Sequence, residues 1–368
     1  MKVLILGGTG LISTAITRDL LARGDEVTLL HRNPGSPTHP VPPDNGAPIP
    51  VPPDRGAALP PPHNRDAASP APHNRDAASA APHNGDVTLP APDDDGTPLS
   101  GSGGPGSARS VRGDRGHPEA LRAAWGDGHD AVIDMLCFTP ADVNVALTAF
   151  GDRVPHYIMC STVDVYTKPA RYLPVDEHHE RNPDKRFPYA RDKQLAEQRL
   201  LDSGVPLTIL RPAATYLDTA VPSYGSFDLA VERLRAGLPV ILHGNNFWAT
   251  CHRDDVARAF VSATAVPPAG RAYNVTGHER LTFEQYWRAV ADALDVKPNF
   301  IRVPPARIGG WCELNFQFDN VFDCSAAAHD LGFASTVPWA EGITHALRHR
   351  PMSPVTQQER DAYEELLN

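Results

Sequence analysis

The feature that most constrains the fold of this chain is a glycine-rich turn near its beginning. Gly7-Gly8-Thr9-Gly10 follows the apolar run Val3–Leu6 and leads into Ser13–Arg23, where apolar residues recur at helical spacing. The pattern predicts a strand, a tight turn and a helix. Glycines let such a turn approach a pyrophosphate, which the positive end of the helix dipole attracts. A plain connection between strand and helix has the same pattern, so the turn alone does not decide between them.

Strands and helices alternate over most of the first two hundred residues. This alternation predicts an α/β fold: a Rossmann-like doubly wound parallel sheet, with a smaller mixed C-terminal substrate lobe. Residues 1–33 and 110–212 are assigned to the dinucleotide-binding domain. Its strands are expected at Val3–Leu6, Val27–Leu30, Ser110–Asp114, Ala131–Leu136, His156–Ser161 and Leu207–Leu210, and its helices at Ser13–Arg23, Pro118–Trp125, Pro140–Phe150 and Tyr189–Ser203.

Residues 34–109 interrupt the pattern. They contain 19 of the 38 prolines and no aromatic residue, and a ten-residue repeat begins at Pro42. Because such a segment buries too little apolar surface to offset its ordering entropy, we predict a disordered, low-complexity insertion. Two alternatives are a metal site made by His63, His73 and His83 and a docking site for a partner.

Residues 213–350 are predicted to form the substrate-binding lobe, with interleaved returns to the core, and 351–368 a C-terminal helix or tail. In this part the pattern is irregular. The acidic segment Gln357–Leu367 is expected to be a solvated helix. Elsewhere, helices are expected at Phe227–Ala236, Val256–Thr264 (capped by Asp254 and Asp255) and Phe283–Leu294 (capped by Thr282), and strands at Val240–Leu242 and Ala272–Val275.

Charge and cysteine usage narrow the class of protein. The formal net charge is −10 and no basic stripe stands out, which argues against a nucleic-acid partner. The five cysteines are widely spaced without a CxxC pair, as expected for buried thiols in a reducing cytoplasm, and no metal site is predicted. No apolar run approaches 18 residues, so we expect a cytoplasmic protein without a membrane anchor.

The second strand ends at His31-Arg32. In a dinucleotide-binding fold, an acid at this place binds the adenosine 2′-hydroxyl, whereas an arginine accommodates a 2′-phosphate. The absence of an acid here favours NADP over NAD as the cofactor. The alternative is an exposed Arg32 that stacks on adenine or has no role.

Tyr189 and Lys193 are four residues apart in a predicted helix, so they lie on one face of it. A nearby ammonium favours the phenolate, and we therefore expect Lys193 to lower the pKa of Tyr189. Such a phenol can exchange a proton with a carbinol as hydride moves to or from a nicotinamide. A surface Tyr–Lys pair without function remains an alternative.

Ser161 and Thr162 end the fifth predicted strand. Active sites of open parallel sheets lie at the carboxyl ends of the strands, where a hydroxyl can bind the same substrate oxygen as Tyr189. The alternative is that these hydroxyls merely cap the strand.

In this order and spacing, the motifs resemble the extended short-chain dehydrogenase/reductase family, the NAD-dependent epimerase/dehydratase group. The resemblance covers residues 1–33 and 110 to about 345. Three further segments carry it: Leu210-Arg211-Pro212, Arg253-Asp254-Asp255-Val256-Ala257 and Ala272-Tyr273-Asn274-Val275-Thr276-Gly277.

The resemblance implies roles for individual residues. Thr162 matches the catalytic hydroxyl, Tyr189 the acid/base, and Lys193 the residue that binds the nicotinamide ribose. Asp114 matches the acid that contacts adenine, and Ser13 stands where the family usually has its third glycine. The implied cofactor-binding set is Gly7, Thr9, Gly10, Leu11, Ile12, Arg32, Asp114, Leu136 and Lys193.

Two positions bear on the reaction and the substrate. Asp164 stands where sugar-nucleotide 4,6-dehydratases have a glutamate for water elimination, and Val163 where some of them have an aspartate; a hydrogen-bonding loop residue is the alternative for Asp164.

Trp248 replaces an arginine that often binds the substrate diphosphate in this family, and Arg253 follows it. Tryptophan stacks rather than clamping a phosphate, so a nucleoside or small glycoside joins the nucleotide sugars as a possible substrate; Trp248 in the core is the alternative.

These features predict an NAD(P)-dependent epimerase or dehydratase that oxidises a sugar hydroxyl transiently to a ketone, with a tightly bound cofactor recycled in each turnover. The alternatives are an NADPH-dependent ketone reductase and a non-catalytic cofactor-sensing or RNA-binding member of the family. The resemblance also implies a homodimer formed through the Tyr189 helix.

Overall fold

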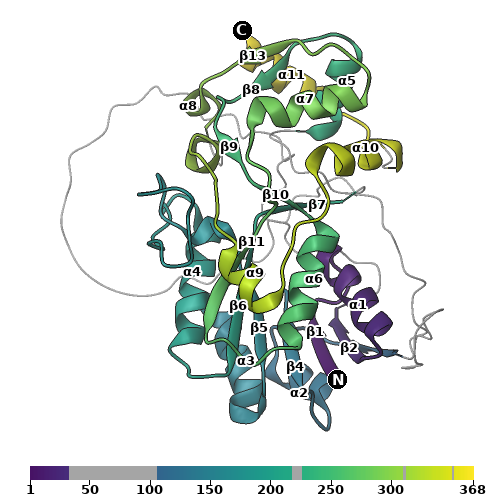
Figure 1. Cartoon of the computed structure of the whole chain (residues 1–368), viewed down its shortest axis with the longest axis vertical. Helices are drawn as coiled ribbons and strands as arrows, with labels where there is room; N and C mark the ends of the chain where they lie inside the picture. Colours follow the sequence, from purple (N-terminus) through teal and green to yellow (C-terminus); the bar gives the residue numbers. More distant parts are fainter. Residues whose placement is uncertain (33–105, 218–225, 310–311, 350–351) are drawn as a thin grey trace.

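A seven-stranded parallel sheet forms the centre of the computed structural model (Figure 1). The structure describes residues 1–32, 106–217, 226–309, 312–349 and 352–368. The strand order is β11-β6-β5-β4-β1-β2-β3, and every neighbouring pair is parallel, as predicted for a doubly wound sheet. The strands are β1 (Lys2–Leu6), β2 (Glu26–His31), β3 (Ser107–Arg112), β4 (Ala131–Asp134), β5 (Tyr157–Cys160), β6 (Leu207–Pro212) and β11 (Arg271–Val275).

Helices cover both faces of this sheet (Figure 1). One face carries α1 (Leu11–Arg23), α6 (Arg253–Thr264) and α9 (Ser325–Leu331), and the other carries α2 (Pro118–Trp125), α3 (Pro140–Phe150) and α4 (Pro188–Leu201). Because side chains alternate along a strand, β1 sends Val3 and Ile5 into the first core and Leu4 and Leu6 into the second. Among the described helices, none is long and apolar enough to span a membrane.

The predicted α/β fold is confirmed, with two shifts. The chain rejoins the sheet at Ser107, three residues earlier than expected, since β3 pairs from Ser107↔Glu26 onward. The mixed polar sequence of this edge strand gave no apolar run that would mark its start. In addition, Ala272–Val275 is part of the main sheet, because β11 pairs with β6. The insertion up to residue 105, including His63, His73 and His83, lies outside the described residues.

A smaller lobe stands beyond the carboxyl ends of the strands (Figure 1). Its core is rich in aromatic side chains: Trp339 stacks on Tyr286 with ring centroids 3.9 Å apart, and Phe227 stacks on Trp287. The elements of this part of the chain are β7 (Ala214–Tyr216), α5 (Phe227–Arg235), β8 (Val240–Leu242), β9 (Phe247–Trp248), β10 (Thr250–His252), β12 (Leu281–Thr282), α7 (Phe283–Ala293), β13 (Phe300–Arg302), α8 (Pro305–Ile308), α10 (Trp339–His349) and α11 (Gln357–Leu367).

The predicted cap of α6 is wrong. The helix begins at Arg253 and is capped by His252, whose Nδ1 accepts a hydrogen bond from Asp254 N at 3.3 Å. Asp255 is fully buried and accepts hydrogen bonds from Thr336 N and Val337 N instead. This carboxylate therefore fastens the chain before α10 to the α6 side of the sheet. By contrast, Thr282 caps α7 as predicted, in a capping box with Gln285.

The helix α11 has the predicted bounds but is not merely solvated. Tyr363 is buried against the lobe core, and its hydroxyl accepts a hydrogen bond from Ile241 N at 2.6 Å. Arg233 lies over the Tyr363 ring, with the guanidinium carbon 4.6 Å from the ring centroid. Tyr363 thus joins the end of the chain to α5 and β8.

Replacing Tyr363 with phenylalanine is expected to lower the free energy of unfolding by about 1–3 kcal/mol, because the buried Ile241 amide loses its partner. Urea denaturation measures the change. The exposed Tyr172→Phe serves as the matched control and should change stability by less than about 0.5 kcal/mol. Equal effects of the two variants would contradict the buried position of Tyr363.

Candidate active site

The glycine-rich turn between β1 and α1 has the shape that a pyrophosphate requires. Gly7 has φ +91°, which favours glycine, and a Cβ on it would lie 2.7 Å from Leu136 Cγ. Ser13 Oγ donates to Gly7 O at 2.6 Å, so the residue in place of the third glycine ties the helix to the turn. The predicted cofactor residues Gly7 and Leu136 therefore lie together.

The start of α1 fits an anionic group. Its N-cap is Gly10, which makes no side-chain capping bond, and the first turn carries no acidic residue. The amides that begin a helix attract anions when no side chain of the protein satisfies them. The predicted residues Thr9, Leu11 and Ile12 belong to this turn. The start of α1 is therefore suited to bind the pyrophosphate of a dinucleotide.

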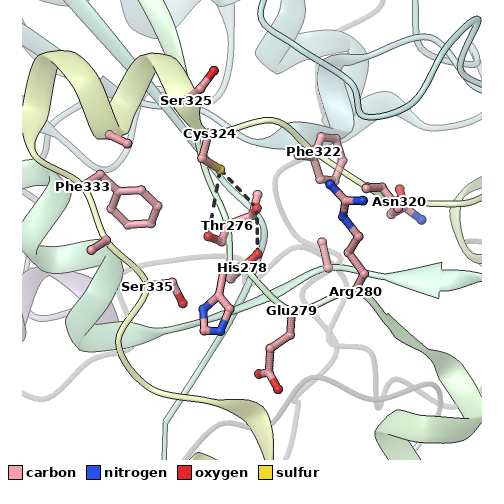
Figure 2. A pocket seen from close by; sticks show the side chains of 15 residues that line it. Thr276, His278, Glu279, Arg280, Asn320, Phe322, Cys324, Ser325, Phe333 and Ser335 are labelled. Atoms are coloured by element: carbon pink, nitrogen blue, oxygen red, sulfur yellow. Dashed lines mark hydrogen bonds between the residues drawn. The ribbon is translucent and has the colours of Figure 1, made fainter.

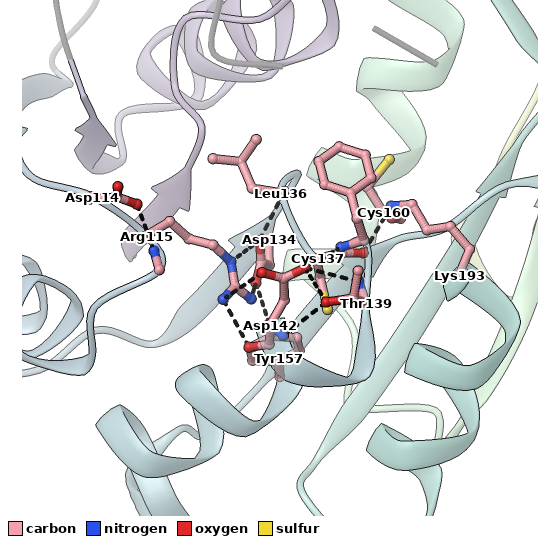
Figure 3. A network of polar contacts seen from close by, with 12 residues as sticks. Asp114, Arg115, Asp134, Leu136, Cys137, Thr139, Asp142, Tyr157, Cys160 and Lys193 are labelled. Carbon is pink, nitrogen blue, oxygen red and sulfur yellow. Dashed lines mark hydrogen bonds and ion pairs between the residues drawn. The ribbon is translucent and has the colours of Figure 1, made fainter. Parts of the chain in front are cut away.

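A buried ion pair links the loop that follows β3 to the last residue of β4 (Figure 3). Arg115 contacts both Asp134 oxygens and donates from Nη1 to Asp142 O at 2.8 Å. Asp134 is fully buried, accepts from the Tyr157 hydroxyl, and accepts from Leu136 N at 2.9 Å. Sequence reasoning missed this network, because neither its arginine nor its aspartate belongs to a motif with a spacing rule.

The loop after β4 is also bound to Lys193 (Figure 3). Lys193 is 1% exposed and donates to Cys137 O at 2.9 Å and to Cys160 O at 2.7 Å. Its ammonium lies 4.3 Å from the centroid of the Phe138 ring. The lysine therefore joins α4 to the carboxyl ends of β4 and β5.

Thr162 and Tyr189 meet at the carboxyl edge of the sheet. Thr162 follows β5 and Tyr189 lies near the start of α4, and the Thr162 side chain lowers the pKa of the Tyr189 phenol. The Tyr189 ring packs between Phe138 and Phe187, with ring centroids 6.4 Å and 6.0 Å away. The two hydroxyls predicted to address one substrate oxygen are thus brought together.

The predicted lowering of the Tyr189 pKa by Lys193 is not observed. Burial raises the pKa of Tyr189, the Asp164 carboxylate raises it further, and the Thr162 side chain only partly opposes the shift. The physical reason is that burial of the phenol outweighs the other influences, and Lys193, whose ammonium is bound to two backbone carbonyls, is not among the groups that shift the pKa of Tyr189. Tyr189 is accordingly a protonated phenol in this structure.

Asp164 belongs to a polar cluster that sequence reasoning missed. Its Oδ2 lies 3.3 Å from Thr162 Oγ1, and its Oδ1 accepts from Asn315 Nδ2 at 2.9 Å. Lys168 Nζ lies 3.6 Å from Asp164 Oδ1, contacts Asn315 Oδ1, and donates to Asn320 Oδ1 at 2.7 Å. Lys168 follows the Thr162 motif closely, but the two asparagines are about 150 residues away, so no local pattern points to them.

Two arginines lie at the ends of β2 and β3, where a dinucleotide fold meets the adenosine. Arg32 is exposed, and its carbonyl accepts from Arg112 Nε at 3.3 Å. His31 turns toward Ser110, and burial lowers the pKa of its ring. Asp114, predicted to contact adenine, is exposed and accepts from Gly116 N at 2.8 Å. Sequence analysis had named Arg32 but not Arg112.

The predicted substrate contacts of Trp248 and Arg253 are not supported. Trp248 is 7% exposed and packs against Phe283, Tyr286 and Phe316 in the lobe core, so its ring is not available for stacking. Arg253 pairs with Asp254 at 2.9 Å, and this carboxylate also binds Arg18 of α1. Position within a family motif did not predict the direction of these two side chains.

A cavity of 350 Å³ opens beside the end of β11 (Figure 2). Phe333 and Ser335 lie on one side of it and Arg280 and Phe322 on another, and the Cys324 thiol is hydrogen-bonded to the Thr276 hydroxyl between them (Figure 2). Asn320 lines the cavity and also binds Lys168. A continuous set of polar contacts thus runs from the cavity to Thr162.

Comparison with known proteins agrees with this architecture. The NAD(P)H-binding family model matches residues 97–267. WbmH of Bordetella bronchiseptica in complex with NAD+ has 19% identity and a TM-score of 0.61, over 95% of this chain and 97% of that one. The dTDP-glucose 4,6-dehydratase of Bacillus anthracis in complex with NAD has 13% identity and a TM-score of 0.65, over 95% and 96%.

The chain has the Rossmann-like α/β fold of these NAD-bound enzymes. UDP-glucose 4-epimerase of Thermotoga maritima with UDP-glucose also has it, at 17% identity and a TM-score of 0.62 over 95% of this chain and 98% of that one. The Epimerase family protein SDR39U1 is 63% identical over 35 residues in both Bos taurus and Homo sapiens. That match spans 10% of this chain and 12% of each relative. The resemblance found in the sequence is thus confirmed in the fold.

Replacing Arg115 with methionine is expected to lower the free energy of unfolding by about 3–5 kcal/mol, because Asp134 is left as an uncompensated buried charge. Arg112→Met, at the exposed end of β3, is the control and should cost less than about 0.5 kcal/mol. Chemical denaturation compares the two. A cost below that of the control would show that the pair does not hold the two loops.

Proposed function

We propose that this protein is an NAD(P)-dependent epimerase or dehydratase that oxidises a sugar hydroxyl transiently to a ketone. The observation that carries the proposal is the placement of Thr162 after β5 and of Tyr189 at the start of α4, both at the carboxyl edge of the sheet, where the Thr162 side chain lowers the pKa of Tyr189. A turn suited to pyrophosphate and a buried Lys193 lie in the same domain. The fold likeness to NAD-bound epimerases and dehydratases supports this reaction class.

In the proposed reaction, Thr162 holds the substrate oxygen and Tyr189 exchanges its proton. A bound oxidised nicotinamide supplies the hydride acceptor and a positive charge that favours loss of the phenol proton. Gly7, Thr9, Gly10, Leu11 and Ile12 would hold its pyrophosphate, and Asp114 its adenine. Lys193, bonded to Cys137 O and Cys160 O, keeps the loops after β4 and β5 in place around the reacting oxygen.

The proposed substrate is a nucleotide sugar, a nucleoside or a small glycoside. Solved structures of the same fold contain UDP-glucose and UDP-glucuronic acid. The cavity beside β11 has the size of a small-molecule site and combines hydroxyls, an arginine and aromatic walls. It is suited to hold the part of the substrate that does not react.

The second candidate is an NADPH-dependent ketone reductase. The raised pKa of Tyr189, caused first by burial, favours this reaction because a protonated phenol is ready to donate to a carbonyl oxygen. The two candidates differ in the fate of the cofactor. A reductase consumes reduced nicotinamide, whereas an epimerase or dehydratase returns it within the turnover.

We also propose that the protein works in the cytoplasm as a homodimer, without nucleic acid. Its four buried thiols and the half-buried Cys324 are unpaired, as in a reducing compartment. The resemblance to the extended short-chain dehydrogenase/reductase family supports the homodimer and its interface through α4. The net charge of −10 opposes binding to a polyanion.

Replacing Tyr189 with phenylalanine is expected to reduce turnover by about 100-fold or more, since the proton donor is lost while the aromatic packing is kept. Stopped-flow absorbance of the reduced nicotinamide, with UDP-glucose, UDP-glucuronic acid and dTDP-glucose as probes, measures the hydride step. Mass spectrometry of the nucleotide released on denaturation measures cofactor binding, which should persist. Full activity of Tyr189→Phe would remove Tyr189 from the mechanism.

The preference for NADP is a separate proposal that rests on Arg32 and Arg112. Replacing both with alanine is expected to weaken NADP+ binding by about tenfold or more and to leave NAD+ binding nearly unchanged, because only the 2′-phosphate requires the cations. Calorimetric titration with each dinucleotide gives the two affinities. An equal loss for both cofactors would exclude a 2′-phosphate site here.

A further inference from the structure

Lys168 is a charged residue near Thr162 and Tyr189 that has no role in the proposed reaction. Its side chain is 13% exposed, and three oxygens surround its ammonium: Asp164 Oδ1, Asn315 Oδ1 and Asn320 Oδ1. Burial lowers the pKa of Lys168, and the Asp164 carboxylate opposes that shift. Asp164 is therefore the charged group that faces it, and the two asparagines add neutral carbonyl oxygens.

The three partners fix the Asp164 carboxylate in one orientation. Asn315 Nδ2 and Lys168 Nζ both act on Oδ1, at 2.9 Å and 3.6 Å. Oδ2 is thereby directed to the catalytic hydroxyl, with Thr162 Oγ1 at 3.3 Å. Asp164 N also donates to Thr162 Oγ1 at 3.2 Å, so backbone and side chain both hold this geometry.

Tyr189, Thr162 and Asp164 are arranged in the order of the two proposed steps, oxidation at one carbon and deprotonation at the next. Tyr189 and Thr162 address the oxygen that becomes a ketone, and Asp164 comes next. A ketone acidifies the C–H bond of its neighbouring carbon, where a carboxylate can act as the base. A simple ketone reduction needs no base at that carbon, so the neighbouring carboxylate favours a reaction that passes through an enolate.

We propose that Lys168 is a positioning residue that holds Asp164 as the base for the carbon next to the one that is oxidised. This inference rests on the proposed function. In the step, Asp164 Oδ2 takes the proton, the electron pair of the C–H bond passes into the ketone, and the enolate oxygen stays at Thr162 and Tyr189. The hydride has already moved to the oxidised nicotinamide, so no further oxidant is needed. A proton then returns to carbon, or a neighbouring hydroxyl leaves as water with the proton that Asp164 took, and return of the hydride from the reduced nicotinamide to the sugar would complete the turnover.

The contacts among Asp164, Lys168, Asn315 and Asn320 also join two segments that are far apart in the chain. Asn315 lies in the short helical segment η3 (Cys312–Phe316), and Asn320 follows it, whereas Asp164 and Lys168 belong to the loop after β5. Asn320 in addition lines the cavity beside β11. A substrate that fills the cavity would thus touch the same side chain that orients Lys168.

The test compares two steps in the same full-length protein. The probes are UDP-glucose, UDP-glucuronic acid and dTDP-glucose in D₂O, with the hydride step followed by nicotinamide absorbance and carbon deprotonation by deuterium incorporation in mass spectra. In Lys168→Met, incorporation is expected to fall about tenfold or more, as expected when a charged partner of the base is lost, while cofactor reduction stays within about twofold. Lys168→Arg keeps the charge and should recover part of the incorporation.

Lys297→Met changes an exposed lysine after α7 and is the matched control, with both steps unaffected. Incorporation that is indifferent to Lys168→Met, or an equal loss of both steps with no recovery in Lys168→Arg, overturns the role of Lys168. Wild-type protein that reduces its cofactor without incorporating deuterium overturns the role of Asp164 as the base. Wild-type protein that does not reduce its cofactor at all overturns the proposed function itself.

Discussion

The ion pair between Arg115 and Asp134 is the interaction on which the proposed site most depends. It lies at the carboxyl edge of the sheet, where the chain leaves β3 and β4. Asp134 orients Leu136, which closes against the glycine-rich turn, and the same loop continues to the Cys137 carbonyl that binds Lys193. The Asp134 carboxylate thus connects the glycine-rich turn, which would bind a pyrophosphate, with α4, which carries Tyr189. Because both charges are buried, the arrangement is stable only when both partners are present.

The site combines a rigid part and a part that comes from the lobe. The sheet fixes the glycine-rich turn and Thr162, and α4 fixes Tyr189 and Lys193. Asp164 is different, because its orientation depends on Asn315 from a segment far along the chain. This division is physically reasonable: the hydride step requires positions set by the sheet, whereas a step at the neighbouring carbon depends on how the lobe holds the substrate.

Local patterns predicted those features that depend on near neighbours in the sequence. The glycine-rich turn, the helix bounds of α2 and α3, and the capping box at Thr282 follow from turn chemistry and periodicity. The placement of Thr162 near Tyr189 followed from the rule that active sites of open parallel sheets lie at the carboxyl ends of the strands, and the family resemblance added the choice of Thr162 as the catalytic hydroxyl. The start of β3 was missed because an edge strand tolerates polar residues.

The remaining differences arise from tertiary contacts that no spacing rule contains. Lys193 was expected to lower the pKa of Tyr189, but two carbonyls hold its ammonium and burial of the phenol dominates. Trp248 was assigned to the substrate from its place in a motif, yet the aromatic core of the lobe surrounds it. Lys168 and its two asparagines come together only in the folded chain.

The central claim is that the phenol of Tyr189 and the hydroxyl of Thr162 converge on a nicotinamide carried by the glycine-rich turn. A crystal structure of the protein with bound NAD+ or NADP+ tests it most directly. The account predicts the pyrophosphate against the start of α1 and the nicotinamide ring facing both hydroxyls. A dinucleotide bound away from this turn, or a ring that neither hydroxyl faces, would contradict the account.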